Sequence, residues 1–276
     1  MTKFFLCVII FCISIIITLT KINAEHEKIN FSSIKDIPET VWQRLSHKKI
    51  YFGHQSVGNN IIDGIKDIIK ENSKIKLNIV KTNDPKMFTT PIFAHSPIGK
   101  NMDPISKINA FAKFMERGIG DKAEFAFFKF CYVDITKNTD INQIFTYYKN
   151  TMKHLKEKYP KTTFIHITVP LTIVQTGFKV WIKKIIGRPI GGYADNIKRN
   201  QFNEMLRNEY KNKEPIFDLA LIESTFPDGT RCFFTDEGKT YYSLVPAYTH
   251  DGGHLNELGR KIVAEQLLIL LAKLSQ

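Results

Sequence analysis

The sequence predicts a three-layer α/β/α domain with about five mostly parallel strands. Short runs rich in β-branched and aromatic residues alternate with longer segments of helical periodicity. Helical segments between strands act as crossover connections, which make neighbouring strands parallel and cover both faces of the sheet. No linker, low-complexity run or internal repeat divides the chain of 276 residues, so one domain with a continuous core is expected.

The first part of the domain, residues 48–104, is expected to contain two strands, one helix and a loop. KKIYFG predicts a strand at 48–53, and the isoleucines of SVGNNIIDGIKDIIKEN fall on one face of a helix at 56–72. IKLNIV predicts a second strand at 75–80. A proline-containing loop is expected at 81–104.

The later elements complete the alternation. Pro104 suits the first turn of a helix that ends at Gly118. The remaining strands are expected at 124–130, 164–170 and 215–220, and the remaining helices at about 140–158, 196–212 and 256–274. Ligands of parallel sheets bind beyond the carboxyl ends of the strands, so the loops that follow the strands are where a site is expected.

Residues 1–24 differ in composition from the domain. Lys3 is followed by the apolar run FFLCVIIFCISIIITL, and the segment ends at the small residue Ala24. This order is typical of a signal peptide, although the run is long enough for an uncleaved membrane anchor as the alternative. We therefore expect residues 25–276 to be a secreted or periplasmic domain that meets a membrane only through an uncleaved N-terminus.

The amino-acid composition limits the kinds of molecule that the protein is expected to bind. The 39 Lys+Arg exceed the 27 Asp+Glu, which gives a net charge of +12, but the lysines are scattered and form no Arg-rich, aromatic-interleaved patch typical of nucleic-acid binding. No metal-binding spacing and no phosphate loop occur, so no metal and no cofactor are expected. A monomer is expected. Cys131 and Cys232 could pair in an oxidising compartment, which the sequence does not decide.

Ser56 lies between the first strand and the first helix. A serine there can cap the helix by accepting a hydrogen bond from a backbone N–H. The same place suits a nucleophile, because free N–H groups and the helix dipole stabilise a nearby oxyanion. A nucleophilic serine also needs a histidine to take its proton and an acid to orient that histidine.

Of the eight histidines, His254 fits the role of base. It lies in the segment YTHDGGHLNELGRK, three residues after Asp251, and the glycines between them allow a compact turn. A carboxylate at that spacing can reach Nδ1 and leave Nε2 free as a general base. Asn256 can cap the final helix and fix this loop. Turn formation and helix capping are the structural alternatives for the same residues.

These motifs resemble those of the SGNH (GDSL-like) hydrolases. Gly-x-x-Ser follows the first strand, Asp-x-x-His precedes the last helix, and the resemblance extends from about 48 to 272, with GHQS in place of the more familiar Gly-Asp-Ser. It implies a flavodoxin-like sheet, Ser56 as nucleophile, His254 as base and Asp251 as its orienting acid. An exported enzyme of this kind is expected to hydrolyse an ester, with O-acetyl groups on a carbohydrate as the substrate class.

The resemblance also implies an oxyanion hole, and here the sequence departs from the family. Gly99 in HSPIGKNMDP is a candidate for the family's glycine, but KFCYVD stands where a Gly-x-Asn-Asp turn is expected. Cys131 or Tyr132, through a backbone N–H or the tyrosine hydroxyl, or Asn101 from the neighbouring loop, could replace the missing asparagine. Asp134 is expected to cap or orient that turn. Loss of one donor typically costs about 2.7–4 kcal/mol of transition-state stabilisation.

Two alternatives to a hydrolase follow from the same residues. An acyltransferase would use the same triad, and a non-catalytic carbohydrate-binding envelope protein would explain the missing asparagine. Four residues of the irregular stretch after the strand at 164–170 could contact a sugar or acyl group, or pack as a lid on the core: Phe178, Trp181, Arg188 and Tyr193.

Overall fold

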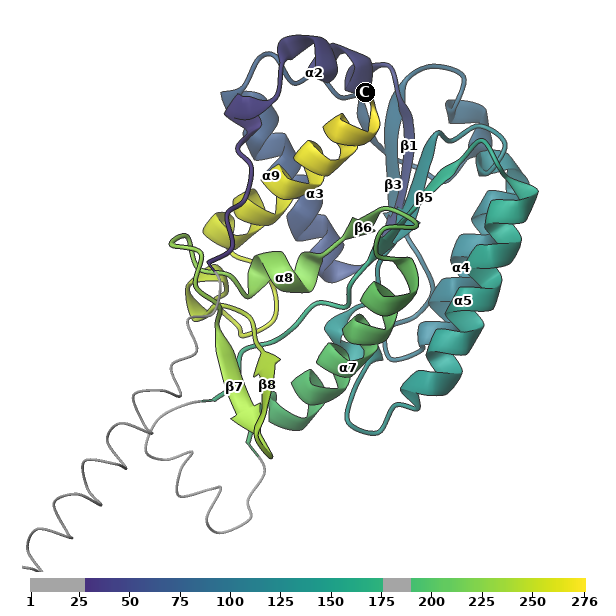
Figure 1. Cartoon of the computed structure of the whole chain (residues 1–276). Helices are drawn as coiled ribbons and strands as arrows, with labels where there is room; N and C mark the ends of the chain where they lie inside the picture. The colour runs from purple at the N-terminus through teal and green to yellow at the C-terminus, as the bar shows by residue number, and fades with distance from the viewer. Residues whose placement is uncertain (1–27, 176–189) are drawn as a thin grey trace, which may run out of the picture.

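A central parallel sheet positions the loops of the domain (Figure 1). The computed structural model describes residues 28–175 and 190–276. Six strands lie in the order β2-β3-β1-β4-β5-β6, and every neighbouring pair is parallel. The strands are β1 (Lys49–His54), β2 (Ile79–Lys81), β3 (Ile92–Pro97), β4 (Phe125–Phe128), β5 (Thr163–Ile167) and β6 (Ile216–Phe217).

Helices cover both faces of the sheet, which gives the three-layer α/β/α fold that the sequence predicts (Figure 1). One face carries α2 (Glu39–Ser46), α3 (Ser56–Glu71), α8 (Leu219–Glu223) and α9 (Glu257–Leu274). The other carries α4 (Pro104–Phe114), α5 (Ile141–Lys158) and α7 (Tyr193–Tyr210). Two apolar clusters, one on each side of the sheet, therefore form the core.

The alternation of β1 shows how the sequence builds both clusters. Ile50 and Phe52 are buried on the side of α3 and α9, whereas Tyr51 is buried on the side of α4. Successive side chains of a strand point to opposite faces, so an almost wholly apolar strand must lie between two helical layers. Since β1 lies between β3 and β4, the loop that follows β1 lies between the loops that follow these two strands.

The expectation of an unbroken loop at 81–104 is wrong. This segment contains β3, whose residues pair with both β1 and β2, and the 3-10 turn Pro85–Met87. Five of the six β3 residues are buried. The sequence pattern did not reveal this strand because prolines stand at both of its ends. Proline interrupts an apolar run, but it can still occupy the terminus of a paired strand.

Other boundaries also differ from expectation. The segment expected as a strand at 215–220 pairs over only Ile216–Phe217 and continues as α8. A hairpin of β7 (Phe233–Asp236) and β8 (Lys239–Tyr242) was not expected. The Asn256 side chain caps α9 by accepting a hydrogen bond from Gly259 N–H at 3.0 Å, which confirms the predicted start of the last helix.

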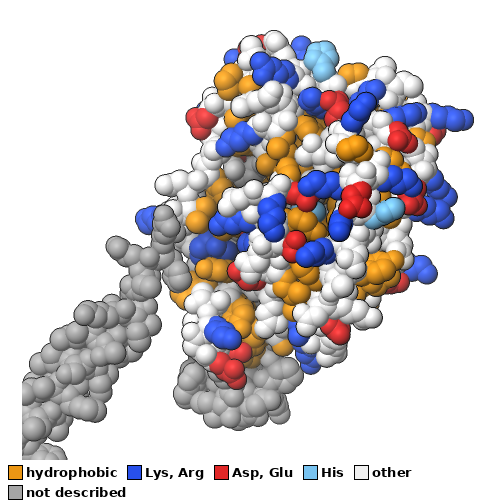
Figure 2. All heavy atoms as spheres, turned by 45° about the vertical axis from the view of Figure 1, so that its right-hand side comes forward, with side chains coloured by type: hydrophobic (Ala, Val, Ile, Leu, Met, Phe, Trp, Pro, Cys, Tyr) orange, Lys and Arg blue, Asp and Glu red, His pale blue; other side chains and the backbone are white. Residues whose placement is uncertain are grey.

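Figure 2 shows the charged side chains of one face of the molecule. On the face displayed in Figure 2, Lys and Arg side chains alternate with Asp and Glu. None of the helices within the described residues is long and apolar enough to cross a membrane. The signal-peptide prediction for 1–24 lies outside the described residues.

The cysteines and the irregular stretch are partly described. Cys131 and Cys232 are both free thiols in the structure, so the pairing that the sequence allowed is not formed. Phe178, Trp181 and Arg188 lie outside the described residues. Tyr193 begins α7, and its hydroxyl donates to the Thr235 carbonyl oxygen at 2.9 Å, so this tyrosine packs on the β7–β8 hairpin.

Candidate active site

Three loops meet at the carboxyl end of β1. Gly53 of β1 pairs with Ser96 of β3 on one side and with Phe128 of β4 on the other. The strand that leads to Ser56 therefore lies between the strand that leads to Gly99 and the strand that leads to Cys131. The resemblance implied that Gly99 belongs with Ser56, but the strand that leads to it, β3, was not expected.

Ser56 is the first residue of α3 rather than its N-cap. The N-cap position belongs to Gln55, and its side chain makes no capping hydrogen bond. The prediction of Ser56 as a capping serine is therefore wrong, because the helix begins one residue earlier than that role requires. The first N–H groups of a helix lack intrahelical partners, so α3 presents its positive end beside the Ser56 hydroxyl.

Gln55 ties the Ser56 loop to the Gly99 loop. Its Nε2 donates to the carbonyl oxygens of Ile98, at 2.9 Å, and Gly99, at 3.0 Å. These bonds fix the Gly99 peptide, and no acceptor for the Gly99 N–H lies in the described part of the chain. Sequence reasoning missed Gln55, although its place next to Ser56 in GHQS, where the family carries an aspartate, was the signal.

Position 99 requires a glycine. Its φ of +50° lies in the left-handed region, and a Cβ there would lie 2.6 Å from the backbone nitrogen of Lys107. Any other residue would push the loop away from α4. The glycine thus keeps its own N–H near the end of β3, in the position where an oxyanion donor is expected.

Asp251 and His254 form a tight pair. Asp251 Oδ2 lies 2.6 Å from His254 Nδ1. Asp251 Oδ1 accepts the backbone N–H groups of Gly253, at 2.9 Å, and His254, at 2.8 Å. Burial acts to raise the pKa of Asp251, but these hydrogen bonds outweigh it and hold the pKa well below its usual range. The carboxylate stays ionised, and Nε2 of His254 makes no hydrogen bond to another described residue.

The loop of His254 docks against α3 and the Cys131 turn. Leu255 N–H donates to Asn60 Oδ1 at 3.3 Å, and Asn60 lies about one helical turn after Ser56. The ring of Tyr132 meets the His254 ring edge-on, with centroids 5.6 Å apart. His254 and Ser56 therefore border the same turn. No hydrogen bond joins Ser56 Oγ to His254 in the structure.

Cys131 contacts the Ser56 hydroxyl, with Sγ 4.0 Å from Oγ. Its backbone N–H donates to Asp134 Oδ2 at 2.6 Å. The Cys131 N–H is thus already engaged, and the prediction that it replaces the missing asparagine as a donor is not supported by this arrangement. Asp134 orients the turn, as its position in the sequence suggested.

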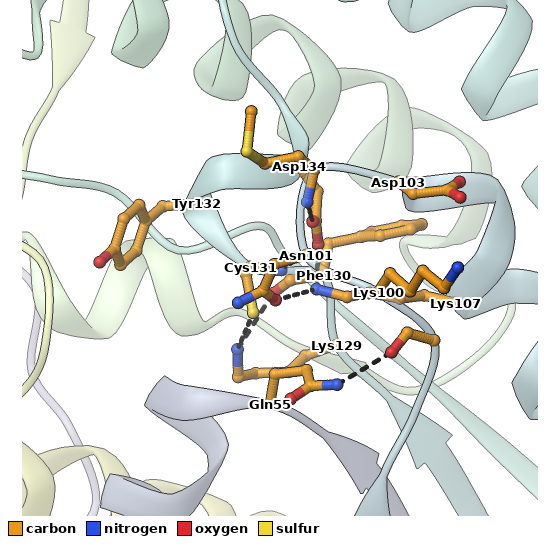
Figure 3. A network of polar contacts seen from close by, with 12 residues as sticks. Gln55, Lys100, Asn101, Asp103, Lys107, Lys129, Phe130, Cys131, Tyr132 and Asp134 are labelled. Carbon is orange, nitrogen blue, oxygen red and sulfur yellow. Dashed lines mark hydrogen bonds and ion pairs between the residues drawn. The ribbon is translucent and has the colours of Figure 1, made fainter.

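Tyr132 and Asn101 take different places around this turn. Figure 3 shows the Tyr132 ring directed away from the polar cluster around Cys131, toward the His254 side. Asn101 lies within the cluster, and its Oδ1 accepts from Lys107 Nζ at 3.0 Å. Asn101 therefore belongs to the polar cluster, whereas Tyr132 packs against the predicted base, His254.

A buried ion pair holds the cluster together. Lys107 Nζ lies 2.5 Å from Asp134 Oδ2, and both side chains are wholly buried. Asp134 Oδ1 also accepts the Met102 N–H at 2.9 Å. One carboxylate therefore joins α4, the loop after β3 and the turn after β4. The lysine was not singled out from the sequence, because one lysine among many on helices gives no signal of burial.

A histidine pair lies beneath the Ser56 loop. His54 Nε2 lies 2.9 Å from His95 Nδ1, and both side chains are buried. Burial lowers the pKa of His54 to about 3 and that of His95 to about 4, so both are neutral. Sequence reasoning missed this pair, since the unexpected strand β3 carries His95 alongside β1.

The chain is similar to several solved structures. They include a GDSL-like lipase from Bacteroides thetaiotaomicron, with 15% identity over 82% of this chain and 89% of that chain and a TM-score of 0.48. A family 3 carbohydrate esterase from Clostridium thermocellum has 14% identity over 83% and 99%, with a TM-score of 0.44. The periplasmic domain of a Salmonella Paratyphi A lipopolysaccharide acetyltransferase has 12% identity over 81% and 84%, with a TM-score of 0.42.

No family model and no curated protein matches the sequence. The similarity to solved structures concerns the general fold and extends to no activity. Any assignment of function therefore depends on the residues at the ends of β1, β3 and β4 and on the loop before α9.

Proposed function

We propose that this protein is a serine ester hydrolase of the SGNH type. The observation that carries the proposal is the Asp251–His254 pair, 2.6 Å apart, on a loop that docks one helical turn from Ser56. The low pKa of Asp251 keeps its carboxylate charged, so it can stabilise an imidazolium on His254. A histidine that is held by a charged carboxylate at Nδ1 can act as a general base through Nε2.

In this mechanism Ser56 Oγ attacks the ester carbonyl carbon while His254 Nε2 takes the hydroxyl proton. The carbonyl electron pair moves to oxygen, and the N–H groups of Ser56 and Gly99 stabilise that oxyanion. The intermediate collapses as the alcohol leaves with the proton from His254. Water then attacks the acyl-Ser56 by the same route, and the acid is released.

The proposed substrate is an O-acyl group, such as acetyl, on a carbohydrate. The proposal combines the resemblance of the motifs with an exported location, secreted or periplasmic, that the composition of 1–24 favours. An acceptor alcohol in place of water would make the same triad an acyltransferase.

The test is hydrolysis of 4-nitrophenyl acetate by the purified domain. We expect turnover by the wild type, none by Ser56→Ala, and a loss of roughly 10³-fold or more in His254→Ala. His154→Ala removes an exposed histidine on α5 and serves as the matched control, with turnover unchanged. Absence of any Ser56-dependent turnover would favour the non-catalytic binding protein, in which the missing asparagine reflects a lost activity.

A further inference from the structure

A second buried lysine lies below the nucleophile. Lys129 directly follows β4, and its backbone N–H donates to the Gly53 carbonyl oxygen at 3.2 Å, three residues before Ser56. The side chain is wholly buried. Unlike Lys107, which contacts the Asp134 carboxylate, Lys129 forms no ion pair with any described residue.

The ammonium group of Lys129 is only partly satisfied. Nζ donates to the Phe130 carbonyl oxygen at 3.1 Å and to Cys131 Sγ at 3.7 Å, a long contact to a weak acceptor (Figure 3). A lysine has three N–H donors, and the third finds no acceptor in the part of the chain that the structure describes. Buried polar groups normally find partners, so this donor requires an explanation.

The ionisable neighbours of Lys129 supply no counter-charge that is free to pair with its ammonium. Burial lowers the pKa of Lys129, and Lys107 acts in the same direction, whereas Cys131, Asp134 and Glu223 oppose the shift. Asp134 is already paired with Lys107. Glu223 is wholly buried, and burial raises the pKa of its carboxyl to about 8, so it is mostly protonated near neutral pH.

The Cys131 thiol contacts both the lysine and the nucleophile. Sγ lies 3.7 Å from Lys129 Nζ and 4.0 Å from Ser56 Oγ. The ammonium is therefore separated from the nucleophilic oxygen by no more than the sum of these two distances. Lys129 and Cys131 are both wholly buried, so a charge here interacts more strongly than it would at the surface.

We propose that the Lys129 ammonium stabilises the oxyanion that forms beside Ser56, in place of the asparagine that the family carries. The proposal rests on the proposed hydrolase function and names the missing third element of its oxyanion hole. Lys129 exchanges no proton in the reaction. It acts across the Cys131 thiol as a positioning residue, whose positive charge favours the negative oxygen over the neutral carbonyl.

The test compares Lys129→Met with Lys100→Met in the full domain. Methionine keeps a similar length without charge, and Lys100 is an exposed lysine on the Gly99 loop that controls for the loss of net charge. We expect kcat for 4-nitrophenyl acetate to fall about 100-fold in Lys129→Met with little change in KM, the pattern of a lost transition-state interaction. Lys100→Met should leave kcat unchanged.

Thermal melting separates charge from structure. Removing an ammonium that has no ion pair should leave the melting temperature unchanged or raise it, because the cost of burying the charge disappears. Lys129→Gln provides a second uncharged variant. A clear fall in melting temperature that accompanies lost turnover in both variants would assign Lys129 a structural role and overturn the proposal.

Binding of acetate, the product anion, gives a readout that does not need turnover. In a Ser56→Ala background we expect acetate affinity, measured by calorimetry, to fall about tenfold on adding Lys129→Met, since an anion near a buried charge loses its partner. Ser56-dependent turnover with unchanged kcat and acetate affinity in Lys129→Met would overturn the role of Lys129 alone. Lys129-dependent acetate binding without any wild-type turnover would overturn the hydrolase function and keep the charged site. Absence of both would overturn both.

Discussion

At the scale of single residues, Asp134 connects the parts of the candidate site. Its two oxygens accept the N–H groups of Cys131 and Met102, and it pairs with buried Lys107. The sequence suggested that Asp134 orients this turn but gave no sign of its ionic partner, because the contact joins residues 27 positions apart. Short motifs and the resemblance they carry make Ser56, Asp251 and His254 candidates, whereas a buried cluster depends on how the loops fold together.

We predict that Asp134→Asn lowers the free energy of unfolding by about 3–5 kcal/mol, because it leaves the Lys107 ammonium buried without a counter-charge. Asp63→Asn is the control, since Asp63 and Lys66 form an exposed pair 3.7 Å apart whose loss should cost less than about 1 kcal/mol. Denaturant unfolding measures both values. Equal small losses in the two variants would show that the buried pair contributes little.

At the scale of elements, the packing of α3 on α9 fixes the distance between the Ser56 loop and the His254 loop (Figure 1). Gly64 of α3 faces α9, and a Cβ there would lie 2.3 Å from the Arg260 carbonyl oxygen. Both helices were predicted correctly from their apolar periodicity. β3 was missed because its prolines resemble loop residues, and the close contact at Gly64 has no local signature.

We predict that Gly64→Ala destabilises the domain by about 1–3 kcal/mol, because the added methyl forces the two helices apart. Ester turnover should fall as well, since the His254 loop moves with α9. Asn59→Ala changes an exposed residue of the same helix and should alter stability by less than about 0.5 kcal/mol. Thermal and denaturant unfolding compare the variants, and a Gly64→Ala protein as stable as Asn59→Ala would refute the close contact.

At the scale of the whole molecule, the alternation of strands and helices predicts the layered parallel fold because crossover connections leave few other arrangements. The strand order was not predictable from this pattern, yet it decides which loops flank β1. It also brings His95 of β3 against His54 of β1. These two neutral histidines link the stability of the domain to pH.

We predict that the domain loses stability as the pH falls below about 6.5. The folded pKa values, about 3 for His54 and about 4 for His95, lie below the usual 6.5, so the unfolded chain binds more protons in this range. The loss at pH 5 should be up to about 2 kcal/mol per histidine. His95→Gln keeps a hydrogen-bonding partner for His54 and should remove about half of this dependence. Identical pH profiles of unfolding for the variant and the wild type would contradict the neutral pair.

The central claim is that Ser56 is a nucleophile activated by His254 and Asp251. Its most direct test is reaction of the purified domain with a fluorophosphonate, followed by mass spectrometry of the peptide that carries the adduct. We predict one adduct for each chain, located on Ser56, formed much more slowly in His254→Ala and at the wild-type rate in His154→Ala. A chain that forms no adduct, or one that carries it on a residue other than Ser56, would contradict the account.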